Sequence, residues 1–199
     1  MIKKIKKIFI ILIINSCFIN SLYAAEANVL RIGSEKAKIT VKVFSSLTCP
    51  HCATFHKNIF EKLKSQYIDE NKVIFEHHSF PLDLAALNAE KVLRSVTDVE
   101  KSFEFLTLIY KKQDQWAIGS DIKKINNSVK KIGVNFGLNS KRIDNFIADE
   151  KIQDEILNAR IAAQKKYKIS STPTIYINDK KYEGKHDFKS FRKKLEKVM

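Results

Sequence analysis

The stretch FSSLTCPHCATFH, residues 44–56, decides the fold, because a strand pattern changes to a helix pattern there around two cysteines. The segment before it, KITVKVFSS, alternates β-branched and polar residues and then becomes continuously apolar, which is typical of a buried strand. After Pro50, apolar residues recur at steps of three and four, which is one face of a helix: Cys52, Phe55, Ile59, Leu63 and Tyr67. The pair Cys49 and Cys52 is therefore predicted to lie where a strand ends and a helix begins.

This position favours reactivity at Cys49. Unpaired backbone N–H groups and the helix dipole stabilise a thiolate at a helix N-terminus, and the imidazole of His51 would add to that stabilisation. Pro50 suits the first helical turn, where its missing N–H costs nothing. A disulfide between Cys49 and Cys52 would release a good leaving group and would be easily reduced. Its loop is too small to contribute much to stability, because closing it removes little entropy from the unfolded chain.

The rest of the chain continues an α/β pattern. A second strand is predicted over KVIFEHHSFPL, followed by helical spacing over residues 82–167. Within that stretch Asp121 and Ser140 are predicted helix starts. The last third is predicted to hold the strand STPTIYIN, a turn at NDKK, a partner strand at KYEG and a closing amphipathic helix. Helices covering a small mixed sheet are the expected architecture.

Residues 1–24 have the order of a secretory signal peptide: lysines, an apolar run and then small residues. The apolar run is short for a membrane span, so we expect this segment to be removed, together with the third cysteine, Cys17. An uncleaved membrane anchor and lipidation at Cys17 are the alternatives. Residues 25–199 are then the mature domain.

The net charge of +14 includes four lysines of the signal segment, which has no Asp or Glu, so the mature chain carries +10. Its basic residues are spread along the chain, alternate with acids and form no nucleic-acid-binding motif. We therefore expect a solvated basic surface and no nucleic acid as partner.

Four landmarks in this order resemble the DsbA-like family of thioredoxin-fold thiol:disulfide oxidoreductases. They are CPHC after an apolar strand, SFPL at the end of the next strand, a helical insertion over about 82–167, and STPT before the terminal hairpin. The resemblance implies a thioredoxin-like fold with an inserted helical domain.

The resemblance also implies roles for individual residues. Cys49 would be the exposed nucleophile, Cys52 its shielded partner, and the two would form the redox-active disulfide. Pro50 and His51 would tune that pair. Thr172 would offer backbone groups to substrate, and Pro173 would follow a cis peptide bond and lie against the cysteines.

One position departs from the family pattern. Many relatives carry an acidic residue about six positions before the first cysteine, where this chain has Val43. Carboxylate assistance to proton transfer at Cys52 is therefore not expected from this strand.

The implied function is disulfide formation in cysteine-containing exported proteins in the periplasm, without a cofactor, with reoxidation by a DsbB-like membrane protein linked to quinone. One alternative is a disulfide isomerase or reductase. Another is a non-catalytic metal or thiol carrier that uses Cys49, Cys52 and His56, with His77 or His78 as a fourth ligand. We expect no metal, because no second C-x-x-C exists and His56 is predicted to point outward.

Overall fold

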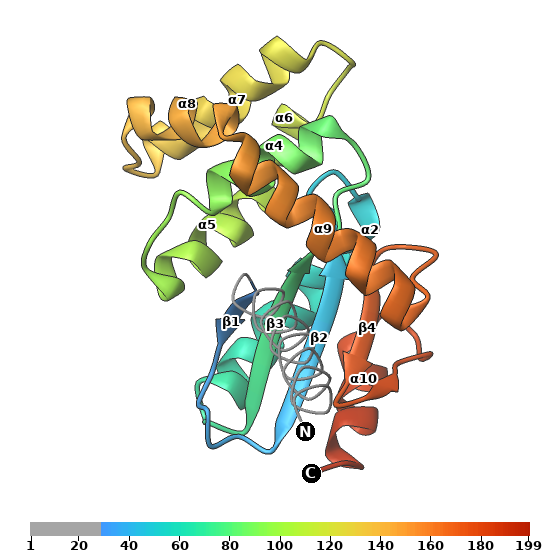
Figure 1. Ribbon diagram of the computed structural model, residues 1–199. Coiled ribbons are helices and arrows are strands. Elements are labelled where there is room, and N and C mark those ends of the chain that lie inside the picture. Colours follow the sequence, from blue (N-terminus) through green and yellow to red (C-terminus); the bar gives the residue numbers. More distant parts are fainter. Residues whose placement is uncertain (1–28) are drawn as a thin grey trace, which may run out of the picture.

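The computed structural model describes residues 29–199, so the predicted signal segment and Cys17 lie outside the described residues. Five strands form one mixed sheet in the order β1-β3-β2-β4-β5 (Figure 1). They are β1 (Leu30–Ile32), β2 (Ile39–Ser45), β3 (Val73–Ser79), β4 (Thr174–Ile177) and β5 (Lys180–Lys181).

Strand β2 leads to the cysteines from the middle of this sheet. It pairs in parallel with β3 and antiparallel with β4, while β1 runs antiparallel to β3. Val41 and Phe44 are fully buried, so the β-branched and apolar positions of this strand serve the core, as their pattern predicts. A central, buried strand gives the residues that follow it a rigid support.

The terminal hairpin is tighter than predicted. The turn has only Asn178 and Asp179 between β4 and β5, so the partner strand begins at Lys180, inside the segment predicted as turn. Asn178 adopts a φ of 53° and its side chain accepts a hydrogen bond from the Thr40 backbone N–H at 2.9 Å. Asparagine tolerates this left-handed conformation, which is why a two-residue turn is sufficient.

The helical segment after the cysteines contains two wide turns. It comprises α2 (Pro50–Phe55), η1 (His56–Phe60), α3 (Glu61–Leu63) and η2 (Lys64–Ile68), where η marks π-helical geometry. The predicted face from Cys52 to Tyr67 is buried throughout, and the wide turns add His56, Phe60 and Ile68 to it. The prediction that His56 points outward is therefore wrong: its side chain is 3% exposed.

Six helices lie between β3 and β4: α4 (Leu84–Leu93), α5 (Val99–Lys111), α6 (Gln113–Trp116), α7 (Ile122–Asn135), α8 (Ser140–Ala148) and α9 (Glu150–Tyr167). Figure 1 shows α6, α7 and α8 beyond one end of the strands, with α9 returning toward β4. Asp121 caps α7 and α8 begins at Ser140, as predicted, with Asn139 as the N-cap of α8.

One hydrophobic cluster joins the sheet to these helices. It includes Val41 of β2, Phe75 of β3, Phe103 of α5 and Ile143 of α8. The closing helix α10 (Phe188–Glu196) adds Phe191 and Leu195. The prediction of an α/β, thioredoxin-like fold is confirmed. Within residues 29–199, no helix is both long and apolar enough to cross a bilayer.

Candidate active site

Cys49 is the residue that caps the helical segment. Its backbone is extended, with φ −80° and ψ 118°, and Pro50 occupies the first helical position. The Cys52 backbone N–H donates to the Cys49 carbonyl at 3.1 Å, which closes the first turn around the pair. Because β2 ends at Ser45, only a short loop separates the central strand from the thiols. Both cysteines are free thiols.

The surroundings of Cys49 favour its thiolate. A hydrogen bond from the Cys52 thiol lowers the pKa of Cys49 most, and burial opposes this. Hydrogen bonding from the Thr172 side chain and from the backbone N–H groups of Cys52 and His51 lowers the pKa further. The result is a pKa of about 5. Cys49 is therefore largely ionised at neutral pH.

The surroundings of Cys52 have the opposite effect. Burial raises the pKa of Cys52, and the hydrogen bond with Cys49 and the charge of Cys49 raise it further, so Cys52 stays protonated. Its side chain is 1% exposed. Two identical side chains three positions apart thus differ in the protonation state that the fold favours.

Cys49 is more enclosed than an exposed nucleophile. That part of the expectation is wrong, since Cys49 is only 7% exposed. The reason is the loop before β4, where the Thr172 carbonyl accepts a hydrogen bond from the Cys49 thiol at 3.4 Å. The Thr172–Pro173 peptide bond is cis, as predicted, and Pro173 is buried. The structure therefore brings Thr172, the residue before Pro173, to Cys49 across 123 residues of sequence.

Pro50 and His51 both lie on the surface of the first turn. The expectation for His51 assigned the effect on Cys49 to its imidazole. In the structure, the contribution of His51 to the lowered pKa of Cys49 comes from its backbone N–H. The helix N-terminus, rather than the ring, carries this effect.

Gln113 also shapes the site. Its side-chain Nε2 donates to the Leu47 carbonyl at 2.7 Å and to the Cys49 carbonyl at 3.1 Å, so it connects α6 to the loop that holds the cysteines. No sequence motif marks Gln113, because its partners lie 66 and 64 residues away. Its neighbours Lys112, Asp114 and Gln115 are polar too, so nothing in the sequence distinguishes Gln113 from them.

The histidines of the metal hypothesis are each bound to another partner. His56 Nε2 lies 2.8 Å from Thr107 Oγ1, His77 Nε2 lies 2.8 Å from Glu90 Oε1, and His78 Nε2 lies 2.9 Å from Glu76 Oε2. Among residues 29–199, no group of three or more His, Cys, Asp or Glu side chains has the arrangement of a metal site. The hypothesis of a site built from both cysteines and His56 therefore has no geometric support.

A cysteine pair between a central strand and a helix, beneath a loop with a cis-proline, places this chain in the thioredoxin-fold class of proteins. The chain belongs to the thioredoxin family, whose model matches residues 25–197. Within that family its structure is DsbA-like. It matches the crystal structure of Wolbachia pipientis alpha-DsbA1 with a TM-score of 0.80 and 29% identity, over 86% of this chain and 90% of that one.

Relatives found by sequence agree. The chain is 28% identical over 180 residues to "Disulfide bond formation protein D" of Bacillus subtilis, covering 84% of this chain and 76% of that protein. It is 28% identical over 156 residues to a "Putative protein-disulfide oxidoreductase" of Rickettsia bellii, covering 78% of this chain. It spans only 59% of the length of that Rickettsia protein.

Proposed function

We propose that this chain is a thiol:disulfide oxidoreductase that introduces disulfide bonds into other exported proteins through Cys49 and Cys52. The observation that carries the proposal is the opposite acidity of the two thiols: a pKa of about 5 at Cys49, and a raised pKa at the buried Cys52. A stabilised Cys49 thiolate is a good leaving group. A disulfide at this site is therefore easily reduced by a substrate, which is the property of an oxidant.

The reaction has two exchanges. A substrate thiolate attacks the Cys49 sulfur of the Cys49–Cys52 disulfide, forms a mixed disulfide and releases the sulfur of Cys52, which takes up a proton. A second substrate thiolate then attacks the substrate sulfur of the mixed disulfide and releases Cys49 as a thiolate. The substrate loses two electrons and the protein gains them as a dithiol.

Thr172 and Pro173 are proposed to face the substrate. The Thr172 carbonyl already bonds to the Cys49 thiol, so an extended substrate segment that reaches Cys49 must pass this loop. Pro50 and His51 are proposed to tune the pair through the geometry of the first helical turn. The expected partners are cysteine-containing proteins in the periplasm and a DsbB-like membrane protein that passes electrons to quinone.

The direction of exchange is tested by the reduction potential, measured by equilibration with glutathione buffers. We expect a value well above that of thioredoxin, about −270 mV, and closer to that of DsbA, about −120 mV. A value near that of thioredoxin would contradict the oxidase role and indicate a reductase or isomerase.

Trapping tests the reaction itself. A Cys52→Ser variant lacks the thiol that resolves the mixed disulfide, so it should accumulate substrate proteins bound through Cys49. The matched Cys49→Ser variant should trap none. Failure of the Cys52→Ser variant to form mixed disulfides with reduced, cysteine-containing proteins would argue against catalysis.

A further inference from the structure

One face of the sheet carries charged side chains at its centre. The strand register places Arg31 of β1, Glu76 of β3, Lys42 of β2 and Tyr176 of β4 in one row across the sheet. Residues directly opposite each other in neighbouring strands point to the same face, so these four side chains share it. Lys42 is half-buried on the middle strand, and lysine is depleted both in strands and in protein interiors. Its position therefore calls for an explanation.

Helix α9 covers this face but leaves a space above it. Figure 1 shows α9 crossing the ends of the strands, and its side toward the sheet includes Ala159, Ala162 and Ala163. These short side chains do not fill the gap, so a cavity of about 320 Å³ lies between α9 and the sheet. We call it the α9 pocket. Its volume lies within the range of known small-molecule sites, roughly 300–1,000 Å³.

The apolar part of the α9 pocket is elongated. Phe44 of β2 is fully buried beneath it, and the ring of Tyr167 lies 4.8 Å from the ring of Phe44. Along α9 the wall runs from Ala159 to Tyr167, which is about 12 Å at 1.5 Å per residue. A slot of this form suits an extended alkyl chain better than a compact ring system.

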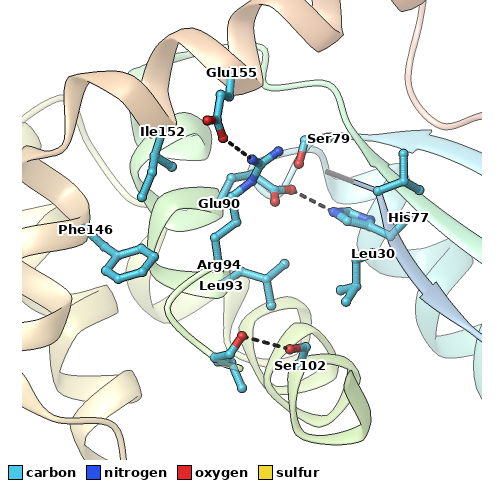
Figure 2. Close-up of a pocket in the computed structure, with 12 residues that line it drawn as sticks. Leu30, His77, Ser79, Glu90, Leu93, Arg94, Ser102, Phe146, Ile152 and Glu155 are labelled. Atoms are coloured by element: carbon cyan, nitrogen blue, oxygen red, sulfur yellow. Dashed lines mark hydrogen bonds and ion pairs between the residues drawn. The ribbon is translucent and has the colours of Figure 1, made fainter. Parts of the chain in front are cut away.

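The two arginines of the α9 pocket already have acidic partners. Arg31 Nε lies 3.2 Å from Glu76, and Arg94 lies 3.7 Å from Glu155. Figure 2 shows the second pair in the wall of a neighbouring cavity of about 350 Å³. Burial lowers the pKa of His78, although Glu76 opposes this, so the imidazole is neutral at neutral pH. These groups leave the charge of the lysines unbalanced.

The two lysines of the α9 pocket lack such partners. Among residues 29–199, neither Lys42 nor Lys166 forms an ion pair, and Lys42 acts on Glu76 only at longer range. Both lysines lie at one end of the slot. Lys42 is opposite Tyr176, whose hydroxyl donates to the Tyr167 carbonyl at 3.2 Å, and Lys166 Nζ lies 5.2 Å from the centre of the Tyr167 ring.

We propose that the α9 pocket binds an aliphatic carboxylate anion, with the carboxylate between Lys42 and Lys166 and the alkyl chain along the alanines of α9. The lysines gain charge-assisted hydrogen bonds, and the chain removes the apolar wall from water. A charged head group or an alkyl chain alone would match only half of the pocket. Neither cysteine lines it, so the inference is independent of the proposed thiol chemistry.

The experiment is a calorimetric titration of the purified protein with decanoate at neutral pH and low ionic strength. We expect saturable binding of one decanoate per chain. Acetate supplies the head group without the chain and should give no measurable binding. Decanol supplies the chain without the charge and should bind at least tenfold more weakly than decanoate.

A pair of lysine variants tests the role of the charge. Lys42→Met keeps the length of the side chain and removes its charge, so decanoate should bind roughly tenfold or more weakly. Lys181→Met is the matched control. Lys181 of β5 is opposite Tyr176 in the same row of the sheet but lies outside the α9 pocket, so this variant should keep the wild-type affinity.

A pair of leucine variants tests the role of the space. Ala159→Leu places a larger side chain in the slot and leaves both lysines intact, so it should abolish binding of decanoate. Asn158→Leu makes the same addition at an exposed position of α9 and should bind normally. Near-UV circular dichroism verifies the fold, and Ala159→Leu carries the test if Lys42→Met does not fold.

Three results would overturn the inference. If the wild-type protein binds no decanoate, the α9 pocket holds only water or is filled by another part of the chain. If decanol binds as tightly as decanoate, the lysines recognise no carboxylate. If Lys42→Met and Ala159→Leu both keep the wild-type affinity, decanoate binds elsewhere on the molecule.

Discussion

The difference between Cys49 and Cys52 arises from what each sulfur can bond to. Cys49 receives donors from the first helical turn and contacts the Thr172 loop. Cys52 is buried, and burial raises its pKa more than its interactions with the Ser46 backbone and the Thr172 side chain lower it. Each cysteine enlarges the pKa shift of the other. The Cys52 thiol stabilises the Cys49 thiolate, and the charge of that thiolate keeps Cys52 protonated. Acidity at this site is therefore a property of the pair.

Gln113 is expected to hold the loop before Cys49 in place. The change Gln113→Met keeps the length of the side chain but removes its donor, so the carbonyls of Leu47 and Cys49 lose a hydrogen bond. We expect the free energy of unfolding to fall by about 1–2 kcal/mol, measured by urea denaturation. The rate at which iodoacetamide alkylates Cys49 should also change, because the loop loses a constraint.

The exposed Gln115 of the same helix is the control for that change. Gln115→Met should leave both the free energy of unfolding and the alkylation rate unchanged. Equal effects of the two substitutions would show that helix α6 as a whole, and not the hydrogen bonds of Gln113, holds the loop before Cys49 in place.

At the scale of elements, the two π-helical turns after the cysteines decide which residues reach the core. An unbroken α-helix would keep a narrower buried face, whereas the wider turns at η1 and η2 bring His56, Phe60 and Ile68 inside as well. His56 there stacks on Phe60 with ring centroids 4.3 Å apart. The spacing of apolar residues predicted the helix but not this widening.

Strand β1 depends on the glycine that ends it. Gly33 has a φ of 116°, and a Cβ at that position would collide with the backbone carbonyl of Val73 and approach Ile74 Cα to 3.1 Å. Gly33→Ala should therefore lower the free energy of unfolding by about 2 kcal/mol or more. The backbone of β3 cannot easily move away from the new Cβ, and alanine is strained at a positive φ. Urea denaturation measures the loss.

Gly137→Ala separates the two causes. Gly137 has a similar φ of 103° but open space around it, so its substitution carries only the conformational cost. An equal loss of stability in the two variants would contradict the proposed collision with β3.

At the scale of the whole molecule, His56 connects the thioredoxin-like part to the helical block. Its Nε2 lies 2.8 Å from Thr107 of α5, and its ring lies 5.0 Å from that of Tyr110. Burial lowers the pKa of His56 to about 3, and the charge of His77 contributes. The folded protein therefore keeps this side chain neutral where an unfolded chain would protonate it.

Acid is expected to destabilise the folded protein through protonation of His56. Since the folded pKa lies below the unfolded value of about 6.5, the contribution of His56 to stability is complete above that pH and is lost as the pH falls toward 3. Between pH 7 and pH 4 we expect the wild-type protein to lose roughly 3 kcal/mol more stability than a His56→Gln variant. Urea denaturation at the two pH values measures this difference.

His186→Gln is the control, because His186 lies exposed before α10. It should follow the wild-type dependence on pH. A His56→Gln variant that loses as much stability in acid as the wild-type protein would show that other groups cause the acid sensitivity.

The sequence by itself determined the fold class and the place of the site. The change from strand spacing to helix spacing around Cys49, together with Pro50, depends on neighbouring residues only, and the structure agrees with it. The order of the four landmarks was sufficient for the resemblance and for the cis bond before Pro173. Local geometry and periodicity depend on a few neighbouring residues, so they can be predicted without knowledge of the tertiary structure.

Only the tertiary structure decided what surrounds the thiols. The Thr172 carbonyl and the Gln113 amide reach Cys49 from 123 and 64 residues away. Val43 correctly indicated that β2 supplies no carboxylate at that position. It could not indicate that Glu90 of α4 places a buried carboxylate beside His77 of β3. Such contacts form only when distant segments pack together. The periodicity of apolar residues predicts the structure within one helix or strand, but not the contacts between such elements.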